Sequence, residues 1–410
     1  MHDPSSSPPD TFARWRVILL LAAAELLVLG LWFSASAVVP ALERDWGITG
    51  GQASWLTMAV QLGFVGGALL SALFNLADVW PARAVFACGA LAGAVLTAAI
   101  PLLGLGFHTT VVVRLVIGAT LALVYPVGMK IMATWTKEDR GLGLGVLVGA
   151  LTVGSAAPHL LRAVGGVGAW RPVLYLAAAL AAVGAVLGGA VGSLGPYRSA
   201  APRFRWRLMG HAVTVRPMRL ANLGYLGHMW ELYAMWTWIP AFLAARYATA
   251  GWPERSAPVA AFAVIAAGGL GSVAAGYVAD RWGRTRTTIA SMVTSGACAL
   301  GIGFLPQGWS VAITAVALLW GFAIVADSAQ FSSAVSELAE PEYMGTMLTT
   351  QTAMGFLVTL GSIRLVPAIV AHGDWRWAFG MLAVGPAVGS WAMWRLKQSP
   401  DAARLANGRG

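Results

Sequence analysis

Charged residues are scarce in this sequence: Lys, Arg, Asp and Glu together make up 11% of its 410 residues, while 58% are hydrophobic. Soluble chains carry about a quarter charged residues, so this composition excludes a soluble protein and indicates a membrane protein. Cysteine is scarcer still, because the sequence contains only Cys88 and Cys298, both inside apolar segments. Their spacing fits neither a disulfide framework nor a metal site. We therefore expect both to be packing residues and expect no bound metal.

Two further absences narrow the function. The glycine-rich stretch 268–276 lacks the Lys-Ser/Thr pair of a phosphate-binding loop and lies inside an apolar run, which excludes ATP as the energy source. The net charge of +10 comes from arginines spread over several loops rather than from one basic, aromatic-bearing face, so it does not indicate a nucleic-acid partner. We expect no cofactor and no enzymatic activity.

Apolar runs long enough to cross a membrane fill most of the chain. A helix needs about 20 apolar residues to span a hydrocarbon core of about 30 Å, and no run shows the alternating polarity of a membrane β-barrel. We predict an all-α membrane protein with twelve transmembrane helices in two six-helix repeats. The predicted spans are 15–42, 52–77, 84–107, 110–135, 140–163, 171–194, 219–246, 256–279, 286–305, 309–334, 343–371 and 375–396.

The longest polar break, 195–218, is rich in arginine and divides the spans six and six. It predicts a cytoplasmic linker between an N-terminal bundle, 15–194, and a C-terminal bundle, 219–396. Residues 1–14 and 397–410 are predicted to be cytoplasmic tails, because the first span is too long for a removable signal peptide and Lys and Arg gather on the cytoplasmic side of membrane proteins. We expect a monomer in contact with lipid, in a bacterial inner (plasma) membrane, with both termini cytoplasmic.

Three short motifs occur twice in the chain, and the two copies of each are separated by nearly the same number of residues. Asp78 in NLADVW precedes Asp280 in GYVADRW, Gly141 in DRGLGLG precedes Gly345 in EYMGTML, and AWRPVLY precedes DWRWAFG. Many secondary transporters are built from such repeats, with two bundles that face each other across a site at the membrane midplane. The pattern therefore favours a transporter.

The polar turn GYVADRWGR carries a more specific pattern. Its residues Gly276, Asp280, Arg281, Gly283 and Arg284 match the Gly-x-x-x-Asp-Arg-x-Gly-Arg loop of the major facilitator superfamily, between the eighth and ninth predicted helices, where that family keeps it. The chain resembles this family over nearly its whole length. The resemblance implies a secondary transporter of small solutes that works by alternating access.

Other motifs match the family less completely. Arg114 followed by Gly118 in the fourth span agrees with it, whereas the first-half copy of the loop around Asp78 has Phe74 and Pro81 where glycines are expected. We therefore expect a weaker or missing latch in the first half. The fifth span lacks the Gly-Pro-x-x-Gly-Gly run of drug/proton antiporters, which counts against a standard multidrug exporter.

The second-half loop is predicted to act as a conformational latch. An Asp at a helix end can hydrogen-bond Arg284 and the N-terminus of a neighbouring helix. We expect this neighbour to be the eleventh helix, because Pro341 suits a first helical turn. Glu337, Glu340 and Glu342 offer partners to the arginines. The alternative is that these arginines only mark a cytoplasmic loop.

Ionisable residues inside membrane spans are costly and indicate function. We predict a central solute- or proton-binding cavity lined by Glu25, Lys130, His228, Trp230, Glu231 and Asp327, with Arg114 nearer the outer end. His228 and Glu231 are three residues apart, so they are expected to share a helix face. Glu25 and Lys130 lie at similar depth and are expected to pair. Buried structural pairing is the alternative for these groups, and for Arg114 hydrogen bonding within the bundle is equally plausible.

The solute class stays open at this point. Lys130 and Arg114 as cavity cations favour an organic or inorganic anion, moved with a proton gradient, and we prefer this reading. The three acids would instead suit export of a cationic or amphiphilic compound, and a receptor or assembly protein without flux is the alternative of another class. His159, Arg162 and Arg364 lie near outer helix ends and are expected to extend toward the membrane interface.

Overall fold

The computed structural model describes residues 11–136, 140–166, 168–192, 194–197, 204–340 and 342–410, and every regular element within them is helical. The all-α prediction is confirmed. Seven long helices form the first half: α1 (Thr11–Phe33), α3 (Gly50–Leu73), α5 (Ala82–Leu102), α6 (Phe107–Leu121), α7 (Tyr125–Trp135), α8 (Arg140–Gly165) and α9 (Trp170–Gly189).

The second half is built in the same way. Its helices are α11 (Arg216–Thr249), α12 (Ser256–Trp282), α13 (Arg284–Ile302), α14 (Ser310–Ala326), α15 (Ser328–Leu338), α16 (Met344–His372), α17 (Trp375–Leu382) and α18 (Val384–Lys397). Short elements connect them or follow them: η1 (Ser36–Val38), α2 (Val39–Trp46), α4 (Leu76–Val79), η2 (Trp206–Leu208), α10 (His211–Thr214) and η3 (Pro400–Gly408).

The twelve expected spans each coincide with a helix or a pair of successive helices. In the described part of the chain, nine of these are both long and apolar enough to cross a membrane; α6 with α7 and α14 with α15 each count as one span. The remaining three are α11, α13 and the pair α17–α18. α11 carries His228 and Glu231 among many tryptophans and tyrosines, whose hydropathy is lower than that of aliphatic residues. In the described part of the chain, length and hydropathy therefore confirm nine of the twelve expected spans, and the other three stay a prediction.

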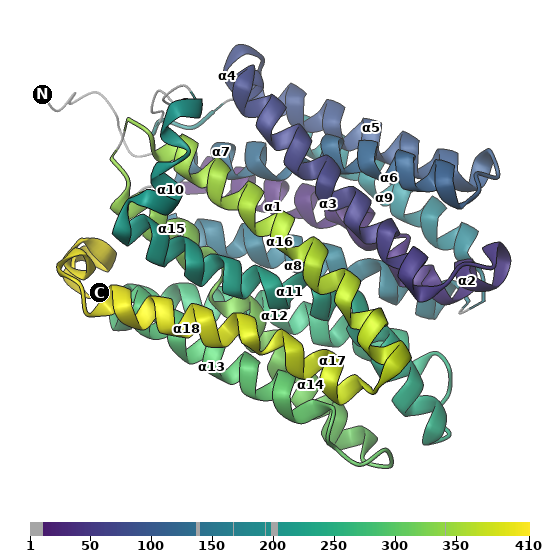
Figure 1. Cartoon of the computed structure of the whole chain (residues 1–410). Coiled ribbons are helices and arrows are strands. Elements are labelled where there is room, and N and C mark those ends of the chain that lie inside the picture. Colours follow the sequence, from purple (N-terminus) through teal and green to yellow (C-terminus); the bar gives the residue numbers. More distant parts are fainter. Residues whose placement is uncertain (1–10, 137–139, 167, 193, 198–203, 341) are drawn as a thin grey trace, which may run out of the picture.

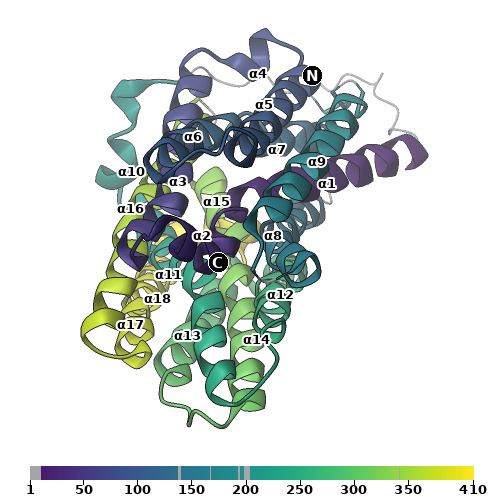
Figure 2. The same cartoon turned by 90° about the vertical axis from the view of Figure 1, so that its right-hand side faces the viewer.

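Helices of each half pack mainly against one another. In the first half α3 packs on α6, and α9 on α1 and α5; in the second half α12 packs on α14, and α18 on α11 and α13. Figures 1 and 2 show the two halves side by side, with purple and blue helices in one group and green and yellow helices in the other. The halves meet along two helix pairs, α8 with α12 and α3 with α16.

Glycines allow the closest helix contacts inside each half. A Cβ atom at Gly118 of α6 would overlap the Val60 carbonyl oxygen of α3, and a Cβ at Gly321 of α14 would overlap the Val264 carbonyl oxygen of α12. The two contacts occupy corresponding places in the halves, which supports the repeat predicted from the motif spacing. Only a residue without a side chain fits such a contact.

The helix contact between the halves is extensive but less tight at its glycines. Between α8 and α12 a Cβ added to Gly149 would lie 3.5 Å from the Gly269 carbonyl oxygen, and a Cβ added to Gly269 would lie 3.2 Å from the Gly149 carbonyl oxygen. The first distance is ordinary van der Waals contact and the second is slightly closer. An added Cβ would therefore be crowded at this interface, but it would not overlap the backbone as it would at Gly118 and Gly321.

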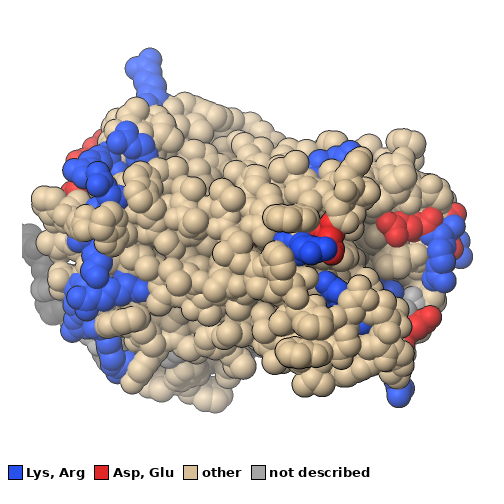
Figure 3. All heavy atoms as spheres, turned by 60° about the horizontal axis from the view of Figure 1, so that its bottom comes forward, with Lys and Arg blue, Asp and Glu red and all other residues tan. Residues whose placement is uncertain are grey.

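The two ends of the molecule differ in charge. We call the end with α4, α10 and both described chain ends the linker end, and the end with α2 and α17 the far end (Figure 1). On the face in Figure 3, Lys and Arg gather at the linker end and both signs of charge occur toward the far end, with mostly uncharged surface between. Such a band is what a hydrocarbon core requires of its protein surface.

Candidate functional site

A cavity of about 1580 Å³ lies between the two halves and reaches the linker end. Its rim includes Asp78 and Lys130 from the first half and Arg284 and Glu337 from the second. Its wall is formed by α7 and α8 on one side and by α11, α15 and α16 on the other. A space of this size exceeds the usual range for ligand pockets, about 300–1,000 Å³, so it can hold a solute of drug size together with water.

Aromatic side chains close the cavity on the side of the far end. Phe64, Tyr233 and Phe356 line it, and the tilted ring of Trp32 packs against them, with its centroid 5.0 Å from that of Phe64, 5.8 Å from that of Tyr233 and 5.3 Å from that of Phe356. These four rings, which we call the aromatic floor, come from α1, α3, α11 and α16. Because both halves contribute, the floor can form only when the halves meet at this depth.

Between the aromatic floor and the far end, hydrogen bonds also help to close the pathway. The Thr359 hydroxyl of α16 donates to Gln61 of α3 and so joins the two halves directly. The hydroxyl groups of Ser36 and Thr57 lie 2.6 Å apart within the first half. The structure is therefore the state that is open at the linker end and closed at the far end.

One face of α11 supplies much of the cavity wall. Tyr225, His228 and Leu232 line the cavity at roughly one-turn spacing, as residues three or four apart on a helix should. Trp230 lies on another face, where its indole N–H donates to the Met381 carbonyl at 3.3 Å. The expected placement of Trp230 in the cavity is therefore wrong, because the helical rotation turns it toward α17.

His228 belongs to a polar cluster at the junction of α14 and α15. Its Nδ1 lies 2.8 Å from Asp327 Oδ1, and its Nε2 lies 2.9 Å from the Ser328 hydroxyl. Asp327 is 1% exposed and does not line the cavity, whereas His228 and Ser328 do. His228 thus stands between the buried carboxylate and the cavity.

Glu231 lies one turn further along α11 but meets different partners. Its carboxylate accepts hydrogen bonds from Trp320 Nε1 at 2.7 Å and from the Ser295 hydroxyl at 2.9 Å. It is 1% exposed and lies inside the second half, away from the cavity lining. Positions three apart are only about 60° from each other around a helix, so the two residues lie on neighbouring sides of α11 as expected. Their side chains nevertheless meet different partners, and only His228 lines the cavity.

Glu25 and Lys130 do not form the expected pair. Lys130 Nζ instead lies 2.5 Å from Asp78 Oδ1 and donates to the Ala77 carbonyl at 2.7 Å. Glu25 is fully buried against Gly128, and neither of its carboxylate oxygens has a hydrogen-bond partner among the described residues. The first-half loop was predicted to be a weak latch. Its acid, Asp78, instead forms an ion pair with Lys130 at the rim of the cavity.

Arg114 supports the backbone of the first half and does not line the cavity. It is fully buried and donates to the carbonyls of Leu31 at 2.7 Å, of Trp32, and of Leu56 at 3.0 Å. Leu31 and Trp32 belong to the last turn of α1, whose carbonyls lack helical partners. Arg114 therefore caps α1, which explains why this helix ends at Phe33 and not at residue 42 as predicted.

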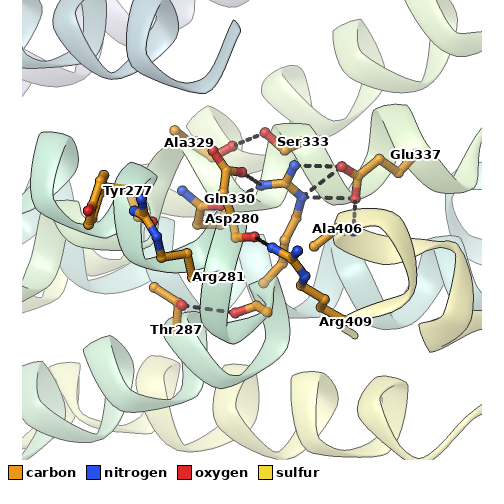
Figure 4. A network of polar contacts seen from close by, with 12 residues as sticks. Tyr277, Asp280, Arg281, Thr287, Ala329, Gln330, Ser333, Glu337, Ala406 and Arg409 are labelled. Atoms are coloured by element: carbon orange, nitrogen blue, oxygen red, sulfur yellow. Dashed lines mark hydrogen bonds and ion pairs between the residues drawn. The ribbon is translucent and has the colours of Figure 1, made fainter. Parts of the chain in front are cut away.

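At the latch predicted between α12 and α13, the closest acid to Arg284 is Glu337, one of the three glutamates expected as partners of the arginines, and not Asp280. Arg284 Nε donates to Glu337 Oε1 at 2.9 Å and Oε2 at 2.8 Å, and Nη2 lies 2.5 Å from Oε1. Asp280 is only a distant partner, 3.8 Å from Arg284, and its side chain is 56% exposed. Figure 4 shows Gln330 and Glu337 directed at the same guanidinium group.

The other residues of the predicted latch have separate roles. Arg281 lies over the Tyr277 ring, 3.5 Å from its centroid, and Gly283 has a φ of 101° that favours glycine. Glu342 pairs with Arg205 of the linker at 2.5 Å instead of with the loop arginines. The predicted role of residue 341 lies outside the described residues.

The segment that contains η3 covers this latch. The Ala406 amide donates to Glu337 Oε2 at 3.0 Å, Arg404 donates to the Leu338 carbonyl at 2.8 Å, and Arg409 donates to the Asp280 carbonyl. Figure 4 shows Ala406 and Arg409 beside the loop. Nothing in the composition of this segment indicated that it would contact the latch.

Sequence reasoning missed the hydroxyl groups of the cavity wall. Tyr125 of α7 lines it, and so do Ser328, Ser332 and Ser336 of α15. The serines recur at every fourth position, which places them on one helix face. This spacing is the signal that the sequence offers for a polar helix face.

His159 and Arg162 do not reach the membrane interface. Their side chains are 1% and 8% exposed, and Arg162 Nη1 donates to the Ala37 carbonyl of η1 at 3.1 Å. Arg364, by contrast, is exposed. Both buried residues therefore face the protein interior near the far end.

Comparison with known proteins gives a family match. The model of the Major Facilitator Superfamily matches residues 21–363. Puromycin resistance protein pur8 of Streptomyces alboniger is 32% identical over 182 residues, which are 42% of this chain. The aligned part spans only about a third, 34%, of that curated relative.

Solved structures with the same fold cover nearly the whole chain. The nucleoside transporter NupG has 17% identity and a TM-score of 0.71, covering 93% of this chain and 99% of its own. The proton:xylose symporter XylE has 14% identity and a TM-score of 0.71, with coverages of 94% and 96%. The human organic anion transporter MFSD10 has 15% identity and a TM-score of 0.70, with coverages of 94% and 100%.

Proposed function

The chain belongs to the major facilitator superfamily, and we propose that it is a secondary transporter that exports amphiphilic, weakly basic or cationic compounds in exchange for protons. The observation that carries this proposal is the state of the two candidate cavity cations. Lys130 is neutralised by Asp78, and Arg114 is enclosed by backbone carbonyls. Neither is available to attract an anion, so the preference for an anionic solute loses its basis.

The remaining cavity wall suits a solute with an aromatic part and hydrogen-bonding groups. Tyr125 of the first half and Tyr225 and Tyr233 of the second half all line the cavity. Aromatic rings bind the flat face of a solute and attract a cation placed over them, while the serine hydroxyls of α15 can donate or accept hydrogen bonds. The similarity to a puromycin resistance protein supports the same class.

We propose that protons enter through His228 and Asp327. A carboxylate removed from water is disfavoured in its charged form, and His228 gives Asp327 a connection to the cavity at 2.8 Å. Glu231, the other acid of the second half that the sequence placed in the cavity, already accepts two hydrogen bonds inside that half. We therefore rank Asp327 above Glu231 as the proton carrier.

We infer the orientation of the protein in the membrane from the distribution of its positive charges. Arginines gather at the linker end (Figure 3), and Lys and Arg are enriched in cytoplasmic loops, so we propose that the cavity opens to the cytoplasm of a bacterial cell. Loss of the aromatic floor together with closure of the linker end would then expose the solute outside. We propose that the protein works as a monomer.

Transport by purified protein in proteoliposomes tests this function, with puromycin as the probe. We expect a pH gradient to drive puromycin accumulation by the wild type and by Glu231→Gln. Asp327→Asn should lose the gradient response but keep puromycin exchange at equal pH, because it removes only the proton site. Wild-type flux that ignores pH would indicate a facilitator. Binding of puromycin without any flux would favour a receptor.

A further inference from the structure

A stripe of α8 continues from the cavity into the closed half of the pathway. Val148 and Thr152 line the cavity, and positions 155, 159 and 162 follow on the same side of the helix, within about 40° of position 148 at 100° per residue. At about 1.5 Å per residue, His159 lies roughly 10 Å beyond Thr152. His159 and Arg162 thus lie on the pathway face, on the other side of the aromatic floor.

These two residues present three buried nitrogen atoms without partners. Neither ring nitrogen of His159 and not Nε of Arg162 has a hydrogen-bond partner in the described part of the chain. The side chains are 1% and 8% exposed. An unsatisfied buried polar group costs about 1–3 kcal/mol, so the arrangement favours a state in which these atoms acquire a partner.

Arg162 also lacks a counter-charge at contact distance. It forms no ion pair with a described residue, and its single bond, to the Ala37 carbonyl, engages Nη1. Arg44 and Glu254 act on it electrostatically with opposite signs, from beyond ion-pair distance. Because arginine stays charged in proteins, the site carries a positive charge with an unoccupied donor.

We propose that His159 and Arg162 form an anion-binding site in the far half of the pathway, which fills when that half opens. Arg162 Nε–H and a ring N–H of His159 would donate to a halide or to a carboxylate or phosphate oxygen. The anion can be an inorganic ion of the outer medium or an acidic group of an organic molecule. The site is distinct from the cavity above the floor and does not depend on the proposed solute.

The site predicts an effect of anions on the conformational equilibrium. A ligand shifts an equilibrium toward the state that binds it better, and here that is the state open at the far end. Anions should therefore reduce access to the cavity from the linker end. Cavity access can be followed with Ser333→Cys in a Cys88→Ser background, because position 333 lines the cavity and Cys298 is buried.

The experiment measures alkylation of that variant by a water-soluble maleimide in nanodiscs. Chloride, phosphate and benzoate are each titrated against gluconate at constant ionic strength. We expect at least one of the three anions to slow alkylation several-fold. Protection by chloride or phosphate identifies an inorganic ligand, and protection by benzoate alone identifies an organic acid.

Three further variants separate the site from a general salt effect. Arg162→Gln and His159→Gln should each abolish the protection while keeping the alkylation rate in gluconate. Arg246→Gln is the matched control: Arg246 is also buried, donates to one carbonyl, that of Gly303, and has an Nε without a hydrogen-bond partner among the described residues, but it belongs to the second half and lies over the Phe242 ring, 5.2 Å from its centroid. It should keep the protection. The proposal is overturned if no anion slows alkylation in the wild-type background, or if protection survives in both His159→Gln and Arg162→Gln.

Discussion

Two Glu–Arg pairs of equal length should differ in strength because they differ in burial. Glu337 and Arg284 lie 2.5 Å apart, with side chains 25% and 13% exposed, whereas Glu342 and Arg205 lie 2.5 Å apart with side chains 60% and 52% exposed. Exposed pairs contribute about 0–1 kcal/mol. Hydrogen bonds to charged groups that are partly buried contribute about 1.5–3 kcal/mol.

The perturbation is Glu337→Gln, with Glu342→Gln as its matched control. Glu337 accepts several N–H contacts from Arg284 and one from the Ala406 amide, and Gln keeps only one acceptor oxygen. We expect Glu337→Gln to lower the free energy of unfolding by about 2 kcal/mol and Glu342→Gln by less than about 1 kcal/mol. Asp280→Asn should resemble the control.

The assay is unfolding of purified protein in mixed micelles by SDS titration, followed by tryptophan fluorescence. The difference between the two variants is the decisive quantity, because each removes one negative charge from a glutamate at the same end of the molecule. Equal losses, or a larger loss for Glu342→Gln, would refute the argument that burial decides the strength of the latch.

Three further outcomes are expected. A reporter active only in the cytoplasm should work when fused after Gly410 or inserted near Ser199, and a strong extracytoplasmic signal at either place would reverse the orientation. Glu25→Gln should change the free energy of unfolding by less than about 1 kcal/mol, because no counter-ion is stranded; a larger loss in the same titration would reveal a charged partner. Gly118→Ala should destabilise by about 1–3 kcal/mol through overpacking, while Gly66→Ala, which meets open space, should not; equal effects would contradict the contact.

The fold was predictable because membrane helices follow from composition and length alone. The repeat and the loop motif then led to the family, and the pairing of Arg284 with a glutamate before the eleventh span was also expected. Which glutamate pairs was not predictable, since Glu337 and Glu342 differ only in the direction that α15 and the following turn give them. The spacing of residues along the sequence does not show in which direction each glutamate side chain points.

The cavity residues were harder to predict for a related reason. Glu231 and Arg114 were both assigned to the cavity, yet Glu231 finds hydroxyl and indole donors inside its own half. Arg114 finds helix-end carbonyls. The partners of a buried charge come from other helices, so its role depends on helix rotation and long-range packing, which a single sequence does not specify.

The glycine contacts indicate which helices move together, those inside each half, and which can shift against each other, α8 and α12 between the halves. Where Gly118 meets the Val60 carbonyl, and Gly321 the Val264 carbonyl, backbone presses on backbone, so neither helix can rotate or shift without separating from its neighbour. Between Gly149 and Gly269 an added Cβ would lie 3.2–3.5 Å from the facing carbonyl oxygen instead of overlapping it, so small tilts cost less there than inside the halves. Each half should therefore behave as a rigid lever, with the α8–α12 contact as its fulcrum, and motion at one end of the pathway must appear with opposite sign at the other.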